Sequence, residues 1–156
     1  MIIVGIDPGL ATVGFGVIQK AEEKITPVSY GCIRTSANKQ TPERLLNIYN
    51  EINALFEKYN PQTVAIEKLF FNKNVTSAMT VSEARGVILL AAQQKQIPIF
   101  EYTPAQIKQA ITGTGRADKR QMQEMIKSLL GLDELPRPDD AADGLSIALC
   151  HIHIMR

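Results

Sequence analysis

Four carboxylates that are far apart in the sequence could do chemistry together. Asp7 and Glu67 each come directly after a short apolar run, and Asp140 and Asp143 stand three residues apart near the C-terminus. Such apolar runs are typical of strands buried on both faces of a sheet. In open α/β sheets, functional side chains gather at the carboxyl ends of these strands. The spacing of the last two acids places both on one face of a helix.

This set of acids favours a divalent metal centre. Clustered negative charges repel each other, so the carboxylate pKa values rise unless a cation compensates. Because the ligands are carboxylates rather than cysteine or histidine, a hard ion such as Mg²⁺ or Mn²⁺ fits them. Each acid also has an ordinary explanation, since Asp7 before Pro8 suits a turn and the later acids suit a helix N-terminus. One shared site explains all four together.

The elements that position these acids form a mixed α/β arrangement. Apolar and alternating runs predict five strands, at residues 2–6, 13–18, 28–34, 63–66 and 97–102. Helical periodicity with start and stop signals predicts five helices, at residues 41–59, 74–96, 104–112, 122–130 and 139–154. Thr41 is expected to cap the first helix, with Pro42 at its first position. The order of elements indicates a single α/β domain with a mixed sheet over residues 1–156.

Composition excludes several classes of protein. The chain has 156 residues, of which 45% are hydrophobic and 21% are charged, enough for one domain with a buried core. No stretch approaches the roughly 18 apolar residues of a membrane span, and a secretory signal is not expected. Two cysteines are too few for a disulfide framework. We therefore expect a cytoplasmic protein with reduced thiols. Gly14-Phe15-Gly16 does not continue as a dinucleotide fingerprint, and it is given no role.

Positive charge is concentrated in the middle of the chain. Residues 68–130 contain nine lysines and arginines against four acids. Four of these cations surround a glycine-bearing loop before a predicted helix: Lys108, Arg116, Lys119 and Arg120. Cations and backbone amides in this arrangement suit phosphate binding, with a solvated surface face as the alternative.

Two further features have both a functional and a structural interpretation. Phe70 and Phe71 closely follow Glu67, and they either belong to the core or stack on unpaired bases. The helix at residues 74–96 is rich in small side chains. It either packs on its own sheet or forms a two-fold interface between two copies of the chain.

A series of short motifs runs through the chain in a fixed order. They are Gly5-Ile6-Asp7-Pro8-Gly9, Gly31-Cys32-Ile33-Arg34-Thr35, Ala65-Ile66-Glu67, Phe70 with Asn74, Ala84-Arg85-Gly86, Phe100-Glu101-Tyr102 and Asp140-Ala141-Ala142-Asp143. This series resembles the RuvC family, the bacterial Holliday-junction resolvases of the RNase H-like superfamily. The resemblance covers about residues 1–153. The first motif alone is weak evidence for this resemblance, whereas the full ordered series is specific to the family.

The resemblance implies an RNase H-like mixed five-stranded sheet flanked by helices, and an endonuclease that acts as a homodimer in recombination and repair. Each subunit is expected to nick one of two like-oriented strands of a four-way DNA junction, leaving 5′-phosphate and 3′-hydroxyl ends. Two Mg²⁺ ions per site, replaceable by Mn²⁺, are expected on Asp7, Glu67, Asp140 and Asp143, with Asp7 shared between them. The RuvA–RuvB branch-migration complex is the expected partner.

The same resemblance assigns roles to single residues. Phe70 matches a wedge-like phenylalanine, and Lys108 and Lys119 match lysines that contact DNA. Charge and position alone add Arg116 and Arg120 to this set.

One ambiguity concerns the aspartate that precedes the last motif. Either Asp139 or Asp140 turns into the site, depending on where the helix begins. Since Asp140 fits the family pattern, we expect it in the site and Asp139 as the helix cap. Gly144 costs about 1 kcal/mol relative to alanine in a helix, which close backbone packing would explain.

Two other classes of function share some of these features. A phosphotransferase of the actin and sugar-kinase type also ends its first strand in an acid and a glycine turn, but it needs a duplicated domain. A non-catalytic module that binds branched DNA is the other alternative. A cleavage assay in Mg²⁺ or Mn²⁺ distinguishes that module from a nuclease.

Overall fold

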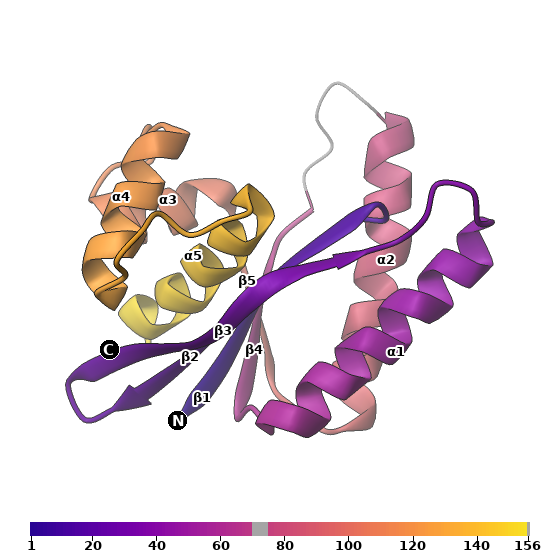
Figure 1. The fold of residues 1–156 in the computed structure, drawn as a ribbon, viewed down its shortest axis with the longest axis horizontal. Coiled ribbons are helices and arrows are strands. Elements are labelled where there is room, and N and C mark those ends of the chain that lie inside the picture. The colour runs from indigo at the N-terminus through magenta and orange to yellow at the C-terminus, as the bar shows by residue number, and fades with distance from the viewer. Residues whose placement is uncertain (70–74, 156) are drawn as a thin grey trace.

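A five-stranded mixed sheet organises the chain, in the strand order β3-β2-β1-β4-β5. The computed structural model describes residues 1–69 and 75–155 (Figure 1). Its strands are β1 (Ile2–Asp7), β2 (Thr12–Ala21), β3 (Lys24–Arg34), β4 (Thr63–Glu67) and β5 (Ile99–Tyr102). The first three strands pair antiparallel, and β4 and β5 add to β1 in parallel. The predicted mixed sheet of five strands is confirmed.

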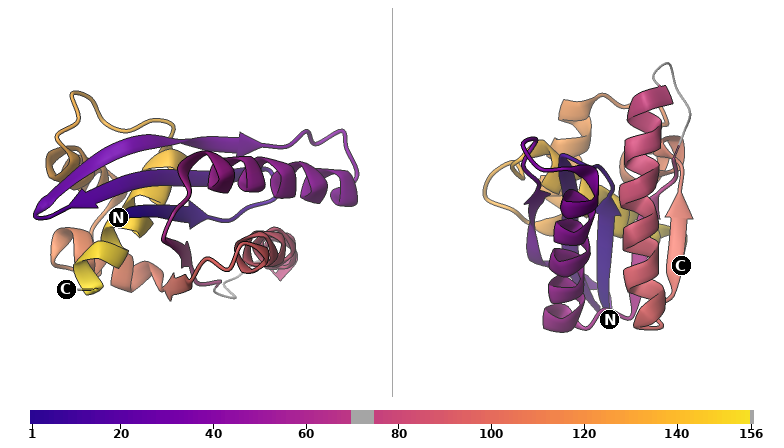
Figure 2. Two further views of the ribbon diagram at one scale, coloured as in Figure 1. Left: turned by 90° about the horizontal axis from the view of Figure 1, so that it is seen from below. Right: turned by 90° about the vertical axis from the view of Figure 1, so that its right-hand side faces the viewer.

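Helices cover both faces of this sheet. Within the described part of the chain they are α1 (Thr41–Tyr59), α2 (Val75–Gln94), α3 (Pro104–Thr112), α4 (Lys119–Leu130) and α5 (Asp139–Ile154). One core cluster joins α1 and α2 to one face, and two further clusters join α3, α4 and α5 to the other face. Figure 2 shows these layers on the two sides of the sheet.

Side chains of β1 alternate between the two layers. Val4 and Ile6 belong to the cluster with α1 and α2, whereas Ile3 belongs to the cluster with α4 and α5. Because side chains of a strand repeat every second residue, Asp7 lies on the same face as Ile3. The first acid is therefore directed toward the layer that contains α5.

The neighbouring strand β4 follows the same alternation. Ile6 pairs with Ile66 in parallel register, and Ile66 faces α1 and α2. Ala65 packs in the cluster with α5. Glu67, two residues further along, therefore shares the α5 face with Asp7. The two strand-end acids lie side by side because register and alternation agree.

Helix α5 packs with its backbone directly against the backbone of β1 and β2. A Cβ atom built on Gly14 would lie 1.9 Å from the carbonyl oxygen of Asp140, and one on Gly144 would lie 2.4 Å from a backbone carbon of β2. Gly5 and Gly16 meet α5 in the same way. Only glycine allows such close approach. We call Gly5, Gly14, Gly16 and Gly144 the glycine seam.

Two helix starts differ from the prediction. Gln40, and not Thr41, is the N-cap of α1, and its backbone N–H donates to Glu43 Oε2 at 3.2 Å. Pro138 is the N-cap of α5, so the expectation that Asp139 caps this helix is wrong. The Asp139 carboxylate does not cap because its two oxygens are engaged by side chains of α4.

The hairpin of β2 and β3 is longer than predicted. Its paired residues extend from Thr12 with Arg34 to Ala21 with Lys24, beyond the apolar runs at residues 13–18 and 28–34. The added residues are mostly polar and partly exposed, so they carry no apolar pattern that would predict a strand. The backbone hydrogen bonds of the hairpin extend the strands instead.

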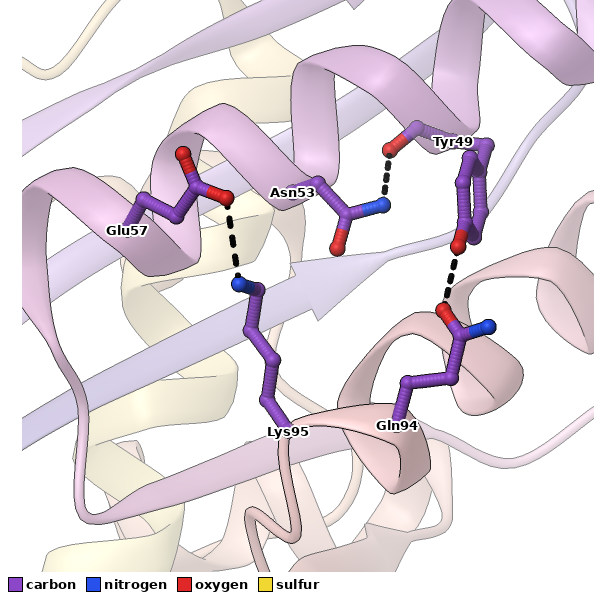
Figure 3. A network of polar contacts seen from close by, with 5 residues as sticks. All are labelled: Tyr49, Asn53, Glu57, Gln94 and Lys95. Carbon is purple, nitrogen blue, oxygen red and sulfur yellow. Dashed lines mark hydrogen bonds and ion pairs between the residues drawn. The ribbon is translucent and has the colours of Figure 1, made fainter.

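Polar contacts join α1 to the C-terminal end of α2 (Figure 3). Lys95 Nζ lies 3.3 Å from Glu57 Oε1, and the Tyr49 hydroxyl is hydrogen-bonded to the Gln94 side chain. Asn53 Nδ2 donates to the Tyr49 carbonyl at 3.0 Å. An exposed ion pair of this kind contributes about 0–1 kcal/mol, so these contacts align the two helices more than they stabilise them.

Helix α2 is more apolar than the sequence led us to expect. By length and composition alone it is long and apolar enough to cross a membrane, and 28% of its most apolar stretch is buried. Ala84 and Ile88 pack in the core, as in a helix that covers a sheet. Val75, Met79 and Leu90 are exposed. Helix α2 therefore presents an apolar face to the outside.

Replacing Gly144 with alanine should destabilise the protein despite the better helix propensity of alanine. The new methyl group would meet the β2 backbone, so we expect the free energy of unfolding in urea to fall by about 1–3 kcal/mol. Ser128→Ala is the control, because Ser128 is exposed in α4, away from the glycine seam and from α2. It should gain up to about 1 kcal/mol. Equal effects of the two substitutions would contradict the close packing of α5.

Candidate active site

Three elements bring four acids to one end of the sheet. Asp7 ends β1, Glu67 ends the neighbouring β4, and Asp140 and Asp143 lie in the first two turns of α5. Carboxylate oxygens of Asp7, Asp140 and Asp143 lie within 4.8 Å of one another. Glu67 joins them through a side-chain hydrogen bond with Asp7. The structure thus brings the four predicted acids together, and we call them the carboxylate cluster.

Burial makes the carboxylate cluster costly to ionise. Burial, with the nearby charge of Glu67, raises the pKa of Asp7 to about 7. Burial and the charge of Asp7 raise the pKa of Asp143 to about 7. Burial raises the pKa of Glu67 as well. Without a cation the cluster therefore retains protons close to neutral pH, and a divalent ion would displace them.

The acids line a hollow between α5 and the pair formed by α3 and α4. Its volume is about 310 Å³, and Asp7, Glu67 and Asp143 share its wall with Lys108 and Lys119. The Lys108 ammonium lowers the pKa of Glu67, acting against its burial. The Lys119 ammonium lowers the pKa of Asp143 in the same way. Two of the predicted DNA contacts therefore stand beside the acids.

The two adjacent aspartates at the start of α5 face different ways. Asp140 contributes an oxygen to the carboxylate cluster. Asp139 Oδ2 forms an ion pair of 2.9 Å with Lys119 Nζ, and its Oδ1 accepts a hydrogen bond of 2.9 Å from Gln123 Nε2. The ambiguity in the sequence is resolved by the helix start, since Asp139 is directed to α4 and Asp140 to β1.

The other predicted DNA contacts lie away from the hollow or outside the described residues. Arg116 is exposed in the loop before α4. Arg120 forms a weak ion pair of 3.8 Å with Glu124 along α4. Neither arginine is among the described residues that line the hollow. Phe70 lies outside the described residues.

A buried hydrogen bond between β5 and α5 lies next to the elements that carry the acids. The Tyr102 hydroxyl lies 2.6 Å from His151 Nδ1, which ties β5 to α5. Tyr102 is paired with Glu67 across the sheet, and its carbonyl accepts the N–H of Lys68 at 2.8 Å. The pair therefore fixes the end of the strand that carries Glu67 relative to the helix that carries Asp143.

Sequence reasoning missed the part of the site that is made of backbone. Gly14 and Gly16 were given no role because they match no ligand-binding motif, yet they seat α5 on the sheet. The sequence did contain a signal for this packing. Glycines at alternate positions of a strand leave one face of the strand without side chains, so another element can pack closely on it. The ion pair between Asp139 and Lys119 was missed because residues 20 apart in sequence give no local pattern.

The fold and the site together define an RNase H-like nuclease domain. A mixed sheet carries acids at the ends of two adjacent parallel strands, and the last helix adds two more acids beside them. All of the donors are carboxylate oxygens, which suits a hard divalent ion.

Comparison with known proteins identifies the family within this class. Residues 3–151 match the profile of "Crossover junction endodeoxyribonuclease RuvC". The protein of that name from Desulfitobacterium hafniense (strain DSM 10664 / DCB-2) is 55% identical over 153 residues, covering 98% of this chain and 93% of its own length. The one from Brevibacillus brevis is 55% identical over 151 residues, covering 97% and 91%. The chain therefore belongs to the RuvC family of crossover junction endodeoxyribonucleases.

Solved structures agree with this assignment. Thermus thermophilus RuvC in complex with a Holliday junction substrate matches with a TM-score of 0.94 and 36% identity, over 100% of this chain and 95% of that chain. The yeast mitochondrial Holliday junction resolvase Ydc2 matches with a TM-score of 0.70 over 97% and 77% of the two chains. Its identity is 15%, so this second likeness concerns the fold alone.

In EDTA, the protein should lose stability as the pH rises from about 5 to about 8. A carboxyl group whose pKa is higher in the folded than in the unfolded chain favours folding at low pH, and this contribution is lost as the pH rises through the folded value. Asp7 and Asp143 are such groups, with pKa values raised from 3.8 to about 7. Urea unfolding across this pH range measures the loss.

The substitution Asp7→Asn removes a buried charge and should flatten this pH dependence. We expect it to raise the free energy of unfolding by about 1–3 kcal/mol at about pH 8. Asp133→Asn, at an exposed acid outside the cluster, should leave the pH dependence as in the wild type. A wild-type stability that is constant over the range would contradict a strained carboxylate cluster.

Proposed function

We propose that this protein resolves four-way DNA junctions by paired symmetric nicks, in recombination and DNA repair. Each nick is the hydrolysis of one phosphodiester bond and leaves 5′-phosphate and 3′-hydroxyl ends. The observation that carries this proposal is the convergence of Asp7, Glu67, Asp140 and Asp143 beside two lysines at one end of the sheet. Membership of the RuvC family supports it, as does the match to T. thermophilus RuvC with its Holliday junction substrate.

The carboxylate cluster fits two Mg²⁺ ions, with Mn²⁺ as a substitute. Its donors are oxygens only, and its raised pKa values reflect burial together with the negative charge of neighbouring carboxylates. Asp7 is hydrogen-bonded to both Glu67 and Asp143, so we assign it as the shared ligand. Glu67 would hold one ion, and Asp140 and Asp143 the other. Bound there, the ions supply Lewis acidity and lower the pKa of water for phosphodiester hydrolysis.

The lysines and arginines bind and orient the DNA backbone in this proposal. Lys108 and Lys119 reach into the hollow from α3 and α4, where they offset the charge of the reacting phosphate. Arg116 and Arg120 lie further out and would contact neighbouring phosphates. Phe70 keeps its expected role of stacking on unpaired bases at the junction.

A homodimer would present two such sites to two strands of the junction. The exposed apolar face of α2, with Val75, Met79 and Leu90, is our candidate for the two-fold interface. Only 28% of the most apolar stretch of this helix is buried, so the helix has surface left for a second copy of the chain. Family membership supports RuvA–RuvB as the partner and the cytoplasm as the location.

Cleavage of a synthetic four-way junction should require Mg²⁺ or Mn²⁺ and the carboxylate cluster. Asp7→Asn should lower the cleavage rate by about a thousandfold, or about 4 kcal/mol, because an ion ligand is lost while DNA binding remains. Plain duplex and an RNA–DNA hybrid are compared as substrates, with Asp133→Asn as the control. Junction binding without cutting in either ion would indicate a binding module, and cleavage of the hybrid alone would indicate a ribonuclease.

Light scattering should show a dimer at micromolar concentration. A double substitution of Met79 and Leu90 by glutamate places charge on the exposed face of α2, so we expect monomers. Val28→Glu, at an exposed apolar residue of β3, is the matched control and should stay dimeric. A wild-type monomer, or a dimer that resists the double substitution, would argue against this interface.

A further inference from the structure

Asp139 stands beside the carboxylate cluster without belonging to it. It is the first residue of α5, and both of its carboxylate oxygens are engaged by α4. Oδ2 lies 2.9 Å from Lys119 Nζ, and Oδ1 lies 2.9 Å from Gln123 Nε2. Lys119 and Gln123 are four residues apart on one helix, so they share a face. Asp139 therefore binds a single face of α4 at its N-terminal end.

This contact places Lys119 between two acidic groups. The ammonium is paired with Asp139, and Lys119 is also one of the residues that line the hollow with Asp7 and Asp143. An ammonium group has three donors, so the bond to Asp139 leaves donors free for a phosphate in the hollow. The long, flexible lysine side chain otherwise loses much of its rotamer freedom when it binds a phosphate. The ion pair restricts that freedom before the substrate arrives.

Divalent ions in the carboxylate cluster would change the electrostatic environment of the Lys119 ammonium. The charges of Asp143 and Asp140 attract the Lys119 ammonium in the present structure. Ions bound to those carboxylates would offset their negative charge and weaken this attraction. Asp139 is not part of the carboxylate cluster and lines a neighbouring hollow with Asp140 and Gln123, so its charge remains available. It is positioned to keep Lys119 at the mouth of the site when the cluster is loaded.

We propose that Asp139 is a positioning residue that holds the Lys119 ammonium at the mouth of the active-site hollow, where the lysine contacts a DNA phosphate. The inference rests on the proposed function, in which Lys119 binds the DNA backbone. Asp139 acts through the lysine and touches neither the DNA nor the metal. Its side chain is 58% exposed and that of Lys119 is 62% exposed, so the pair adds little to folding and its variants should fold.

The test compares Asp139→Asn, Lys119→Met and the double variant, with Asp133→Asn as a control that also removes one exposed negative charge. The probe is a synthetic four-way junction. Steady-state cleavage in Mg²⁺ with the junction in excess gives kcat and KM, and fluorescence anisotropy in EDTA gives Kd at several salt concentrations. The EDTA measurement reports on Lys119 without any bound ion.

We expect Asp139→Asn to lower kcat about 3- to 10-fold and to change KM by less than about twofold. The slope of log Kd against log salt should fall by up to about one, because one phosphate contact is less well formed. In the Lys119→Met background, Asp139→Asn should have no further effect. Asp139→Glu retains a carboxylate and should recover most of the wild-type rate. Asp133→Asn should match the wild type throughout.

Three outcomes would overturn the inference. Faster cleavage or a steeper salt slope with Asp139→Asn would show that Asp139 masks Lys119 from DNA. Additive losses in the double variant would show that Asp139 acts independently of the lysine. Wild-type cleavage and salt slope in Lys119→Met would refute the DNA contact in the proposed function, and with it the role of Asp139.

Discussion

Helix α5 can lie directly on β1 and β2 only where no side chain intervenes, and the glycine seam provides that clearance. The approach brings Asp140 and Asp143 within reach of Asp7, against the mutual repulsion of the carboxylates. Apolar packing of α5 opposes this repulsion, since Leu145 and Leu149 are fully buried against the sheet. The folded protein thus holds together carboxylates that would separate in water. A divalent ion that binds them relieves their repulsion, and this relief contributes to the free energy of ion binding.

Much of the site could be predicted from the sequence because strand-end acids and helical spacing are local patterns. The apolar runs before Asp7 and Glu67 fixed both acids at one sheet edge, and the spacing of Asp140 and Asp143 fixed their common face. What could not be predicted depends on contacts between distant segments. The seat of α5 on Gly14 is of this kind. So is the pairing of Asp139 with α4, which depends on where two helices begin.

The two layers of helices contribute different side chains around the acids. The layer of α3, α4 and α5 places Lys108 and Lys119 beside the acids, where their charges partly offset the raised carboxylate pKa values. The layer of α1 and α2 contributes no described side chain to that hollow. Instead, α2 exposes apolar residues such as Met79 and Leu90, whose burial would favour association with a second chain. Helix α2 is nevertheless connected to the acids, because Val81 and Arg85 line a second hollow together with Asp7 and Glu67.

The carboxylate cluster joins the first strand of the domain to its last helix. While the chain is still emerging from the ribosome, Asp7 and Glu67 exist without the aspartates of α5. Ile3 and Ile18 also lack their cover until α5 arrives, because their core cluster contains Leu145 and Leu149. A truncated product would be poorly folded and would lack half of the acidic groups. The order of elements therefore means that a nascent or broken chain without α5 has no complete set of acidic groups.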